Sequence, residues 1–152
     1  MDTIVAGYHI RREIGSGTYS TVFLALQARS GTLHALKHIK QFEQSEGFPR
    51  TTAREIKLLQ RLRHPNIIAL QDVIVRENYV TGHSGVYLVF EYFPHDLQSI
   101  LHSPASCFAL PPGQLKGYLY QMVCGLAYMH RMGVVHRDLK RHAAAAHVQQ
   151  AT

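Results

Sequence analysis

The 152-residue sequence is poor in cysteine and has no long uninterrupted apolar stretch. Its two cysteines, Cys107 and Cys124, cannot form a disulfide framework and lack the spacing of metal ligands. We therefore expect free thiols in a reducing compartment. Apolar stretches such as residues 67–75 are too short to cross a bilayer, and the N-terminus has no signal-peptide pattern. These absences predict an intracellular protein, in the nucleus or the cytoplasm, with no membrane partner.

Acidic side chains are also scarce, with 10 Asp and Glu against 16 Lys and Arg and a formal net charge of +6. A basic chain of this kind can serve a polyanionic partner. The basic residues are scattered, however, and no stripe of alternating aromatic and basic residues is present to stack bases. A nucleic-acid partner is therefore the weaker interpretation of the positive charge. Binding to phosphate groups on a nucleotide or on a protein explains this charge better. The 46% of hydrophobic residues is typical of a globular chain rather than a disordered one.

Apolar residues alternate along the first part of the chain, which is the period of β-strands. The pattern predicts a three-stranded antiparallel meander over residues 8–16, 21–28 and 32–40. A helical pattern follows over residues 49–63 and stops at His64-Pro65-Asn66. The meander and this helix form the first predicted block.

The rest of the chain changes from strands to helices. Two apolar runs, residues 68–75 and 86–90, flank a polar loop as the strands of a hairpin would. A short helix is predicted near residues 96–101 and a long one over residues 111–132, closed by Gly133. Strands followed by helices predict an α+β fold, with a change of lobe near Phe93-Pro94.

Lys37 is the first candidate site residue, because it shares a predicted strand face with Leu33, Ala35 and Ile39. Its ammonium would leave water there, at a cost of roughly several kcal/mol unless it is paired. Phosphates or a carboxylate would satisfy it. The alternative is an edge lysine whose stem lies along the sheet.

Glu55, on the helix after that strand, is the natural carboxylate partner. An alternative is a capping box, Thr52-x-x-Glu55, in which Glu55 reaches back to the helix start. Pro49 suits the first helical turn and would place Glu55 inside the helix. We favour an ion pair between Lys37 and Glu55.

The chain resembles a protein kinase, because four motifs occur in the order of the kinase signature: Gly15-Ser16-Gly17-Thr18-Tyr19-Ser20-Thr21-Val22, Ala35-Leu36-Lys37, Arg54-Glu55 and His136-Arg137-Asp138-Leu139-Lys140. A glycine pair by itself is weak evidence for a nucleotide-binding loop, since ordinary hairpin turns also contain glycine pairs. Ser20 stands where the kinase pattern has its third glycine. The resemblance covers residues 8–140 and implies a kinase N-lobe at 8–93 and a partial C-lobe at 94–140. Residues 141–152 differ in composition from the preceding sequence, so we expect them to form an unrelated, disordered tail.

The resemblance implies transfer of the ATP γ-phosphoryl group to a protein serine or threonine. Asp138 would be the catalytic base and Lys140 would neutralise the phosphoryl charge, while Lys37 and Glu55 would form the phosphate-positioning pair. The residues that would contact ATP are Ile14, Gly15, Ser16, Gly17, Thr18, Val22, Ala35, Lys37, Phe90, Glu91, Phe93 and Asp96.

Three segments narrow the resemblance to the cyclin-dependent kinases. Residues 46–56 (EGFPRTTAREI) are similar to the cyclin-contacting helix of that family, and the Glu-Gly-Phe-Pro opening leans toward its transcription-associated branch. Thr18-Tyr19 is similar to the family's inhibitory phosphorylation pair, and residues 88–97 resemble its gatekeeper and hinge. The resemblance implies a cyclin bound through the helix at 49–63, and a protein substrate.

The sequence also departs from the family. Ala143 stands where a metal-binding asparagine is expected, and the chain contains no Asp-Phe-Gly. Both protein anchors for Mg²⁺ are thus absent, and no metal ligand is assigned. The substrate platform of the larger lobe is absent too, so the helix at 111–132 is expected to expose an apolar stripe.

We accordingly expect a chain truncated inside its catalytic loop and inactive in turnover. A non-catalytic fragment that binds a cyclin, or weakly a nucleotide, is the alternative. A metal site at His142 and His147 is a poor third possibility, because residues five apart do not share a helix face.

Overall fold

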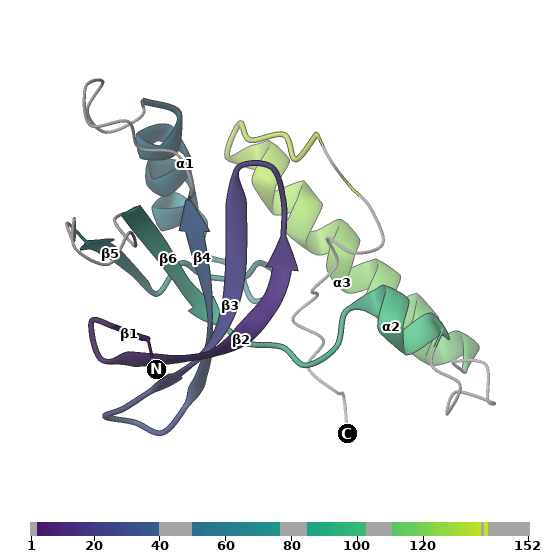
Figure 1. The fold of residues 1–152 in the computed structure, drawn as a ribbon. Helices are drawn as coiled ribbons and strands as arrows, with labels where there is room; N and C mark the ends of the chain where they lie inside the picture. The colour runs from purple at the N-terminus through teal and green to yellow at the C-terminus, as the bar shows by residue number, and fades with distance from the viewer. Residues whose placement is uncertain (1–2, 40–49, 77–84, 103–110, 138, 140–152) are drawn as a thin grey trace. The chain divides into compact units, whose positions relative to one another are not determined.

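The computed structural model describes residues 3–39, 50–76, 85–102, 111–137 and 139 (Figure 1). Its elements, in chain order, are β1 (Ile4–Val5), β2 (Tyr8–Ser16), β3 (Ser20–Gln27), β4 (Leu33–Ile39), α1 (Arg50–Arg61), β5 (Asp72–Arg76), β6 (Gly85–Glu91), α2 (Leu97–His102) and α3 (Pro112–Arg131). The chain divides into two compact units, Met1–Arg61 with Ala69–Tyr92, and Leu62–Ile68 with Phe93–Thr152.

The first unit is built on a six-stranded sheet in the order β1-β2-β3-β4-β6-β5, with every neighbouring pair antiparallel. The predicted meander is confirmed as β2, β3 and β4, each within one residue of its expected bounds. The two later apolar runs also pair as expected, as β5 and β6. The sequence did not reveal β1, because two residues show no alternation, nor the insertion of β6 between β4 and β5.

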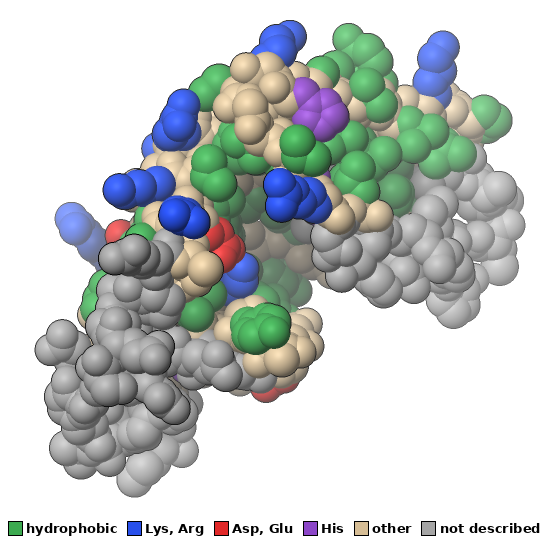
Figure 2. All heavy atoms as spheres, turned by 90° about the horizontal axis from the view of Figure 1, so that it is seen from above, with side chains coloured by type: hydrophobic (Ala, Val, Ile, Leu, Met, Phe, Trp, Pro, Cys, Tyr) green, Lys and Arg blue, Asp and Glu red, His purple; other side chains and the backbone are tan. Residues whose placement is uncertain are grey.

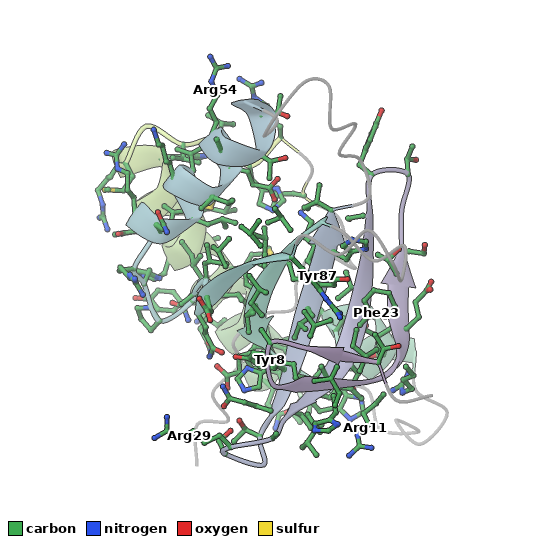
Figure 3. The ribbon with its side chains drawn as sticks, turned by 60° about the vertical axis from the view of Figure 1, so that its left-hand side comes forward. Tyr8, Arg11, Phe23, Arg29, Arg54 and Tyr87 are labelled. Atoms are coloured by element: carbon green, nitrogen blue, oxygen red, sulfur yellow. The ribbon has the colours of Figure 1, made fainter. Side chains whose placement is uncertain are left out.

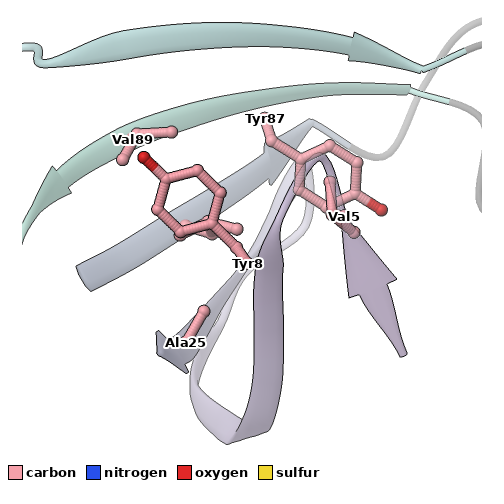
Figure 4. Packing of buried hydrophobic residues seen from close by; sticks show 6 residues of the cluster. Val5, Tyr8, Ala25, Tyr87 and Val89 are labelled. Atoms are coloured by element: carbon pink, nitrogen blue, oxygen red, sulfur yellow. The ribbon is translucent and has the colours of Figure 1, made fainter. Parts of the chain in front are cut away.

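One face of this sheet carries the most deeply buried side chains. Leu36 of β4, Val89 of β6 and Ala25 of β3 have no exposed surface, and Val5 of β1 packs in the same cluster (Figure 4). Tyr87 of β6 belongs to this cluster as well, although three strands separate β6 from β1. The sheet must therefore curl so that its own strands cover this face.

A hydrogen bond joins the two outer strands of the curled sheet. The Arg76 side chain on β5 donates from Nη1 to the Ile4 carbonyl on β1 at 3.0 Å. Burial in this cluster raises the pKa of the Tyr87 phenol. The pKa of the Tyr8 phenol is also raised, by burial and by the nearby charge of Asp72.

The other face of the sheet is covered by α1. Ile56 and Leu59 of the helix pack with Leu88 of β6 and Leu70, which lie within a second buried cluster. The opposite side of α1 is polar and basic, with Arg54, Lys57 and Arg61 exposed at helical spacing. Figure 2 shows Lys and Arg side chains along α1, and Arg54 extends away from the sheet in Figure 3. The amphipathic pattern of the predicted helix is thus confirmed.

The second unit is organised on α3. The helix begins at Pro112 and ends at Arg131. Gly133 follows two residues later, and its φ of 71° lies in the left-handed region that glycine favours. The Gly133 N–H donates to the His130 carbonyl at 3.0 Å and the Val134 N–H to the Met129 carbonyl at 2.9 Å. These two hydrogen bonds form a Schellman motif, so the prediction that Gly133 closes the helix is confirmed.

The short segment Leu62–Ile68 packs on α3 within the same unit. The Asn66 amide donates to the Gln121 side chain at 3.2 Å, and the Arg63 N–H donates to the Tyr128 hydroxyl at 3.1 Å. Gly125 lies between these two helical positions and is buried against the Asn66 backbone. A glycine is needed there because a Cβ atom would come within 3.0 Å of the Asn66 carbonyl oxygen.

The expected apolar stripe on α3 is present, since Leu115, Leu119, Tyr120 and Val123 are exposed. Within the described part of the chain, no helix combines the length and the apolar character that a membrane crossing requires.

Candidate functional site

The glycine pair lies where β2 turns into β3. The Gly17 N–H donates to the Ser20 carbonyl at 2.8 Å and closes the turn. Neither Gly15 nor Gly17 adopts a positive φ, so the turn does not need glycine for its backbone conformation. A Cβ atom on Gly17 would meet nothing closer than the Ser20 carbonyl at 3.8 Å. What the two glycines provide is a backbone without side chains, which a ligand can approach closely.

Ser20 is the first residue of β3 and pairs with Ile39 of β4. A residue with a Cβ atom is therefore accommodated where the kinase pattern has its third glycine. Ile14 occupies a β-bulge between Glu13 and Gly15, where the register of β2 against β3 shifts. Bulges of this kind redirect a side chain near functional sites.

The register of the sheet brings four predicted site residues to one face. Val22 of β3 lies opposite Lys37 of β4, and Ala35 of β4 lies opposite Phe90 of β6. Directly paired residues of antiparallel strands point to the same face. Lys37 and Ala35 are two residues apart on β4 and therefore share that face too. The structure thus places Val22, Ala35, Lys37 and Phe90 together, on the face that α1 covers.

Lys37 and Glu55 form the expected ion pair, with 2.7 Å between Nζ and Oε1. The capping-box alternative is wrong, because α1 begins at Arg50 and Thr52 is already its third residue. The expectation that the Lys37 charge is withdrawn from water needs correction, since 30% of its side chain is exposed. A pair of this exposure adds only about 0–1 kcal/mol to stability. The position of the ion pair therefore matters more for binding a ligand than for the stability of the fold.

A cavity of about 300 Å³ opens beside this pair. It lies between the glycine turn and the start of α1, and its lining combines the ion pair with hydroxyl groups and one aliphatic side chain. The lining residues are Tyr19, Ser20, Lys37, Ile39, Thr51, Thr52 and Glu55. The opening of the cavity explains why Lys37 is not fully enclosed.

The predicted hinge residues lie around the end of β6. Glu91 is the last residue of β6 and pairs with His34 of β4, while Phe93 and Asp96 belong to the second unit. The Asp96 carboxylate accepts a hydrogen bond from the Ser99 N–H at 2.6 Å and caps the start of α2. Sequence reasoning missed this cap, although an aspartate just before a short helical run is a preferred N-cap.

The catalytic-loop motif is described only in part. Asp138 and Lys140 lie outside the described residues, whereas His136 and Arg137 lie within them and are exposed. Arg137 has a φ of 64°, in the left-handed region that non-glycine residues rarely adopt. Such a conformation costs about 1–3 kcal/mol and is concentrated at functional sites.

Among the described residues, no group of three His, Cys, Asp or Glu side chains is placed to hold a metal ion. Ala143 lies outside the described residues, and its methyl side chain has no oxygen to offer. His142 and His147 lie outside them as well.

The order and geometry of these motifs agree with comparisons to known proteins. Residues 8–143 match the family model described as the protein kinase domain. The chain belongs to the protein kinase family. This kinase chain is 44% identical to CTD kinase subunit alpha of Schizosaccharomyces pombe over 128 residues, which cover 84% of the chain and 20% of that protein.

Two plant relatives are similar to a comparable degree. Cyclin-dependent kinase C-3 of Oryza sativa subsp. japonica is 43% identical over 138 residues, covering 85% of the kinase chain and 41% of the relative. Cyclin-dependent kinase C-1 of Arabidopsis thaliana is 39% identical over 138 residues, which cover 84% of the kinase chain and 27% of that relative. The kinase chain thus spans less than half the length of these curated relatives. The predicted resemblance to cyclin-dependent kinases, transcription-associated branch included, and the predicted α+β kinase fold are confirmed.

Proposed function

We propose that this chain is the ATP-binding part of a cyclin-dependent serine/threonine protein kinase, whose reaction is transfer of the γ-phosphoryl group of ATP to a protein hydroxyl. The observation that carries the proposal is the ion pair between Lys37 and Glu55 at 2.7 Å, on the sheet face that also holds Val22 and Ala35. An ammonium held at a fixed point by a helix carboxylate is suited to bind nucleotide phosphates.

Most of the predicted site residues have a physical role in this proposal. Lys37 donates to phosphate oxygens while Glu55 fixes its position, and the bare backbone of the glycine turn approaches the phosphates. Val22 and Ala35 offer apolar surface to a base, with Ile14, Phe90 and the main chain of Glu91 and Phe93 near it. Asp138 acts as the base toward the substrate hydroxyl and Lys140 neutralises the transferred group.

Nucleotide binding tests the central role of Lys37. The Lys37→Met variant should bind ATP at least about tenfold more weakly, because a charge-assisted hydrogen bond is lost. Lys57→Met is the matched control, since Lys57 lies exposed on α1 outside the cavity lining. The measurement is isothermal titration calorimetry with ATP, with circular dichroism to verify folding. An equal loss of affinity in the two variants would contradict the proposal.

A cyclin partner is proposed for α1, whose outer side is basic and contains the exposed Leu58. Charge reversal at Arg50, the first residue of α1, should weaken retention by a cyclin more than the same change at Arg11 of β2. A pull-down with purified cyclin measures the difference. Equal losses would indicate that general basicity drives the association.

The second candidate function is a non-catalytic module that binds a cyclin or a nucleotide without turnover. It is favoured by the sequence at one position, because Ala143, where the family pattern has a metal-binding asparagine, has no side-chain oxygen to offer. Phosphoryl transfer in kinases depends on metal ions that bridge the phosphates. The two candidates agree on binding and differ on turnover, which a phosphorylation assay separates.

A further inference from the structure

The solvent side of α1 carries a row of like charges. Arg54, Lys57 and Arg61 are all exposed, at the spacing i, i+3 and i+7 that places side chains on one side of a helix. Lys and Arg side chains follow this helix in Figure 2, and Arg54 points away from the sheet in Figure 3. We call these three residues the cationic stripe.

The described part of the chain does not balance the charge of the cationic stripe. The carboxylate in the sequence of α1 belongs to Glu55, whose Oε1 lies 2.7 Å from the Nζ of Lys37 on the side that faces the sheet. None of the three cations forms an ion pair with a described residue. Like charges three and four residues apart repel each other and destabilise a helix. The stripe therefore weakens α1 as long as no opposite charge meets it.

A helix face that meets only water is the simplest alternative explanation. Such faces typically mix charges of both signs, which pair along the helix. Arg61 lies in the last turn, where a cation complements the helix dipole, but Arg54 and Lys57 lie too far from that end to benefit. Water and the dipole thus leave two of the three cations unexplained, and a partner with the opposite charge explains all three.

An apolar side chain beside the stripe indicates the class of partner. Leu58 follows Lys57 directly and is 41% exposed. A protein can bury this leucine while its carboxylates meet the cations, as in interfaces with an apolar centre and a polar rim. A nucleic acid offers phosphates but no aliphatic surface. Because the cations follow a helical spacing, a second helix with carboxylates at the same spacing matches them best.

We propose that the cationic stripe, together with Leu58, docks an acidic helix of a protein partner. The inference rests on the proposed function, which assigns a cyclin to α1, and adds the chemistry of the surface that binds there. That surface has carboxylates at helical spacing beside an apolar contact for Leu58. Complementary charges of this kind govern association rate and partner choice more than affinity. The stripe therefore selects among partners of similar shape.

The probe for this surface is a helix-forming alanine peptide with glutamates at the spacing of the stripe and one leucine beside them. Its binding to the 152-residue chain is followed by fluorescence anisotropy. The double variant Lys57→Glu/Arg61→Glu should bind about tenfold more weakly, because two attractions become repulsions. Arg11→Glu/Arg29→Glu is the matched control, since it changes the net charge equally at exposed residues outside α1. Circular dichroism verifies folding, and Lys57→Gln/Arg61→Gln, with a smaller expected loss, replaces the reversal if that variant does not fold.

Several results would overturn the proposal. One is the absence of saturable peptide binding, and another is an equal loss of binding in the two charge-reversal variants. Equal binding of a peptide of the same composition, with its glutamates spread around the helix, would remove the argument from spacing. Equal binding of a DNA duplex would identify a general polyanion surface instead.

Retention of a purified cyclin by the same variants separates this inference from the proposed function. If both charge-reversal variants retain the cyclin equally, the acidic-helix inference fails and the cyclin proposal stands. If the peptide binds through the stripe but no cyclin is retained, the cyclin proposal fails and the docking surface stands.

Discussion

Two neighbouring residues of β4 show how a single position in a strand decides between packing and chemistry. Leu36 and Lys37 point to opposite faces of the sheet, because successive strand residues alternate. Leu36 is completely buried in the cluster formed with Tyr87 and Val89, whereas Lys37 faces α1 and pairs with Glu55. A shift of one residue in register would exchange the two roles.

The burial of Leu36 leads to a prediction about stability. Leu36→Ala should lower the free energy of unfolding by about 2–5 kcal/mol, since it removes buried methyl groups and leaves a cavity. Leu33→Ala, on the same strand but 45% exposed, should change it by no more than about 0.5 kcal/mol. Urea unfolding followed by circular dichroism compares them. Similar losses would show that the Leu36 face is not the core.

At the scale of the element, two of the three glycines of α3 have different surroundings. Gly125 is buried against the Asn66 backbone, while a Cβ atom on Gly117 would meet nothing within 4 Å. Glycine inside a helix costs stability relative to alanine unless close packing requires it. The structure therefore assigns a packing role to Gly125 and none to Gly117.

The two glycines give a matched pair of substitutions. Gly125→Ala should destabilise the chain by about 1–3 kcal/mol, because the new methyl group would approach the Asn66 carbonyl oxygen within 3.0 Å. Gly117→Ala should stabilise it by up to about 1 kcal/mol through helix propensity. Thermal unfolding measures both. Stabilisation by both changes would mean that Leu62–Ile68 does not pack against α3 as described.

At the scale of the whole molecule, activity requires more than the ion pair and the glycine turn. Kinase catalysis relies on positioning and on neutralising charge that spreads over the transferred phosphoryl group. Asp138 is the proposed base, but the methyl side chain of Ala143, at the position of the expected asparagine, cannot bind a metal ion. Loss of even one preorganised electrostatic contact typically lowers the rate by about 10²–10³.

We therefore expect no useful phosphorylation of protein substrates by the 152-residue chain. The measurement is incorporation of radiolabelled phosphate from ATP with added cyclin, run beside Lys37→Met and Asp138→Asn. These variants identify any signal from a contaminating kinase, because contaminant activity would persist in both. Turnover by the unmutated chain that disappears in both variants would contradict the expectation and favour the enzyme over the binding module.

Much of the molecule follows from the sequence, because the signals are local. Strand alternation gave β2, β3 and β4, helical spacing gave α1 and α3, and Gly133 marked the end of α3 through its left-handed conformation. The order of the motifs indicated the family. It also suggested Lys37 and Glu55 as a pair, although they are 18 positions apart in the sequence.

The remaining features depend on contacts between residues distant in sequence, and only the tertiary structure decided them. Examples are the insertion of β6 between β4 and β5, and the curling that packs Val5 against Tyr87. Another is the partial exposure of Lys37, which results from the cavity formed where the glycine turn meets α1. Periodicity shows which side of an element is apolar, but not which other element covers it, because that choice depends on the packing of the whole unit.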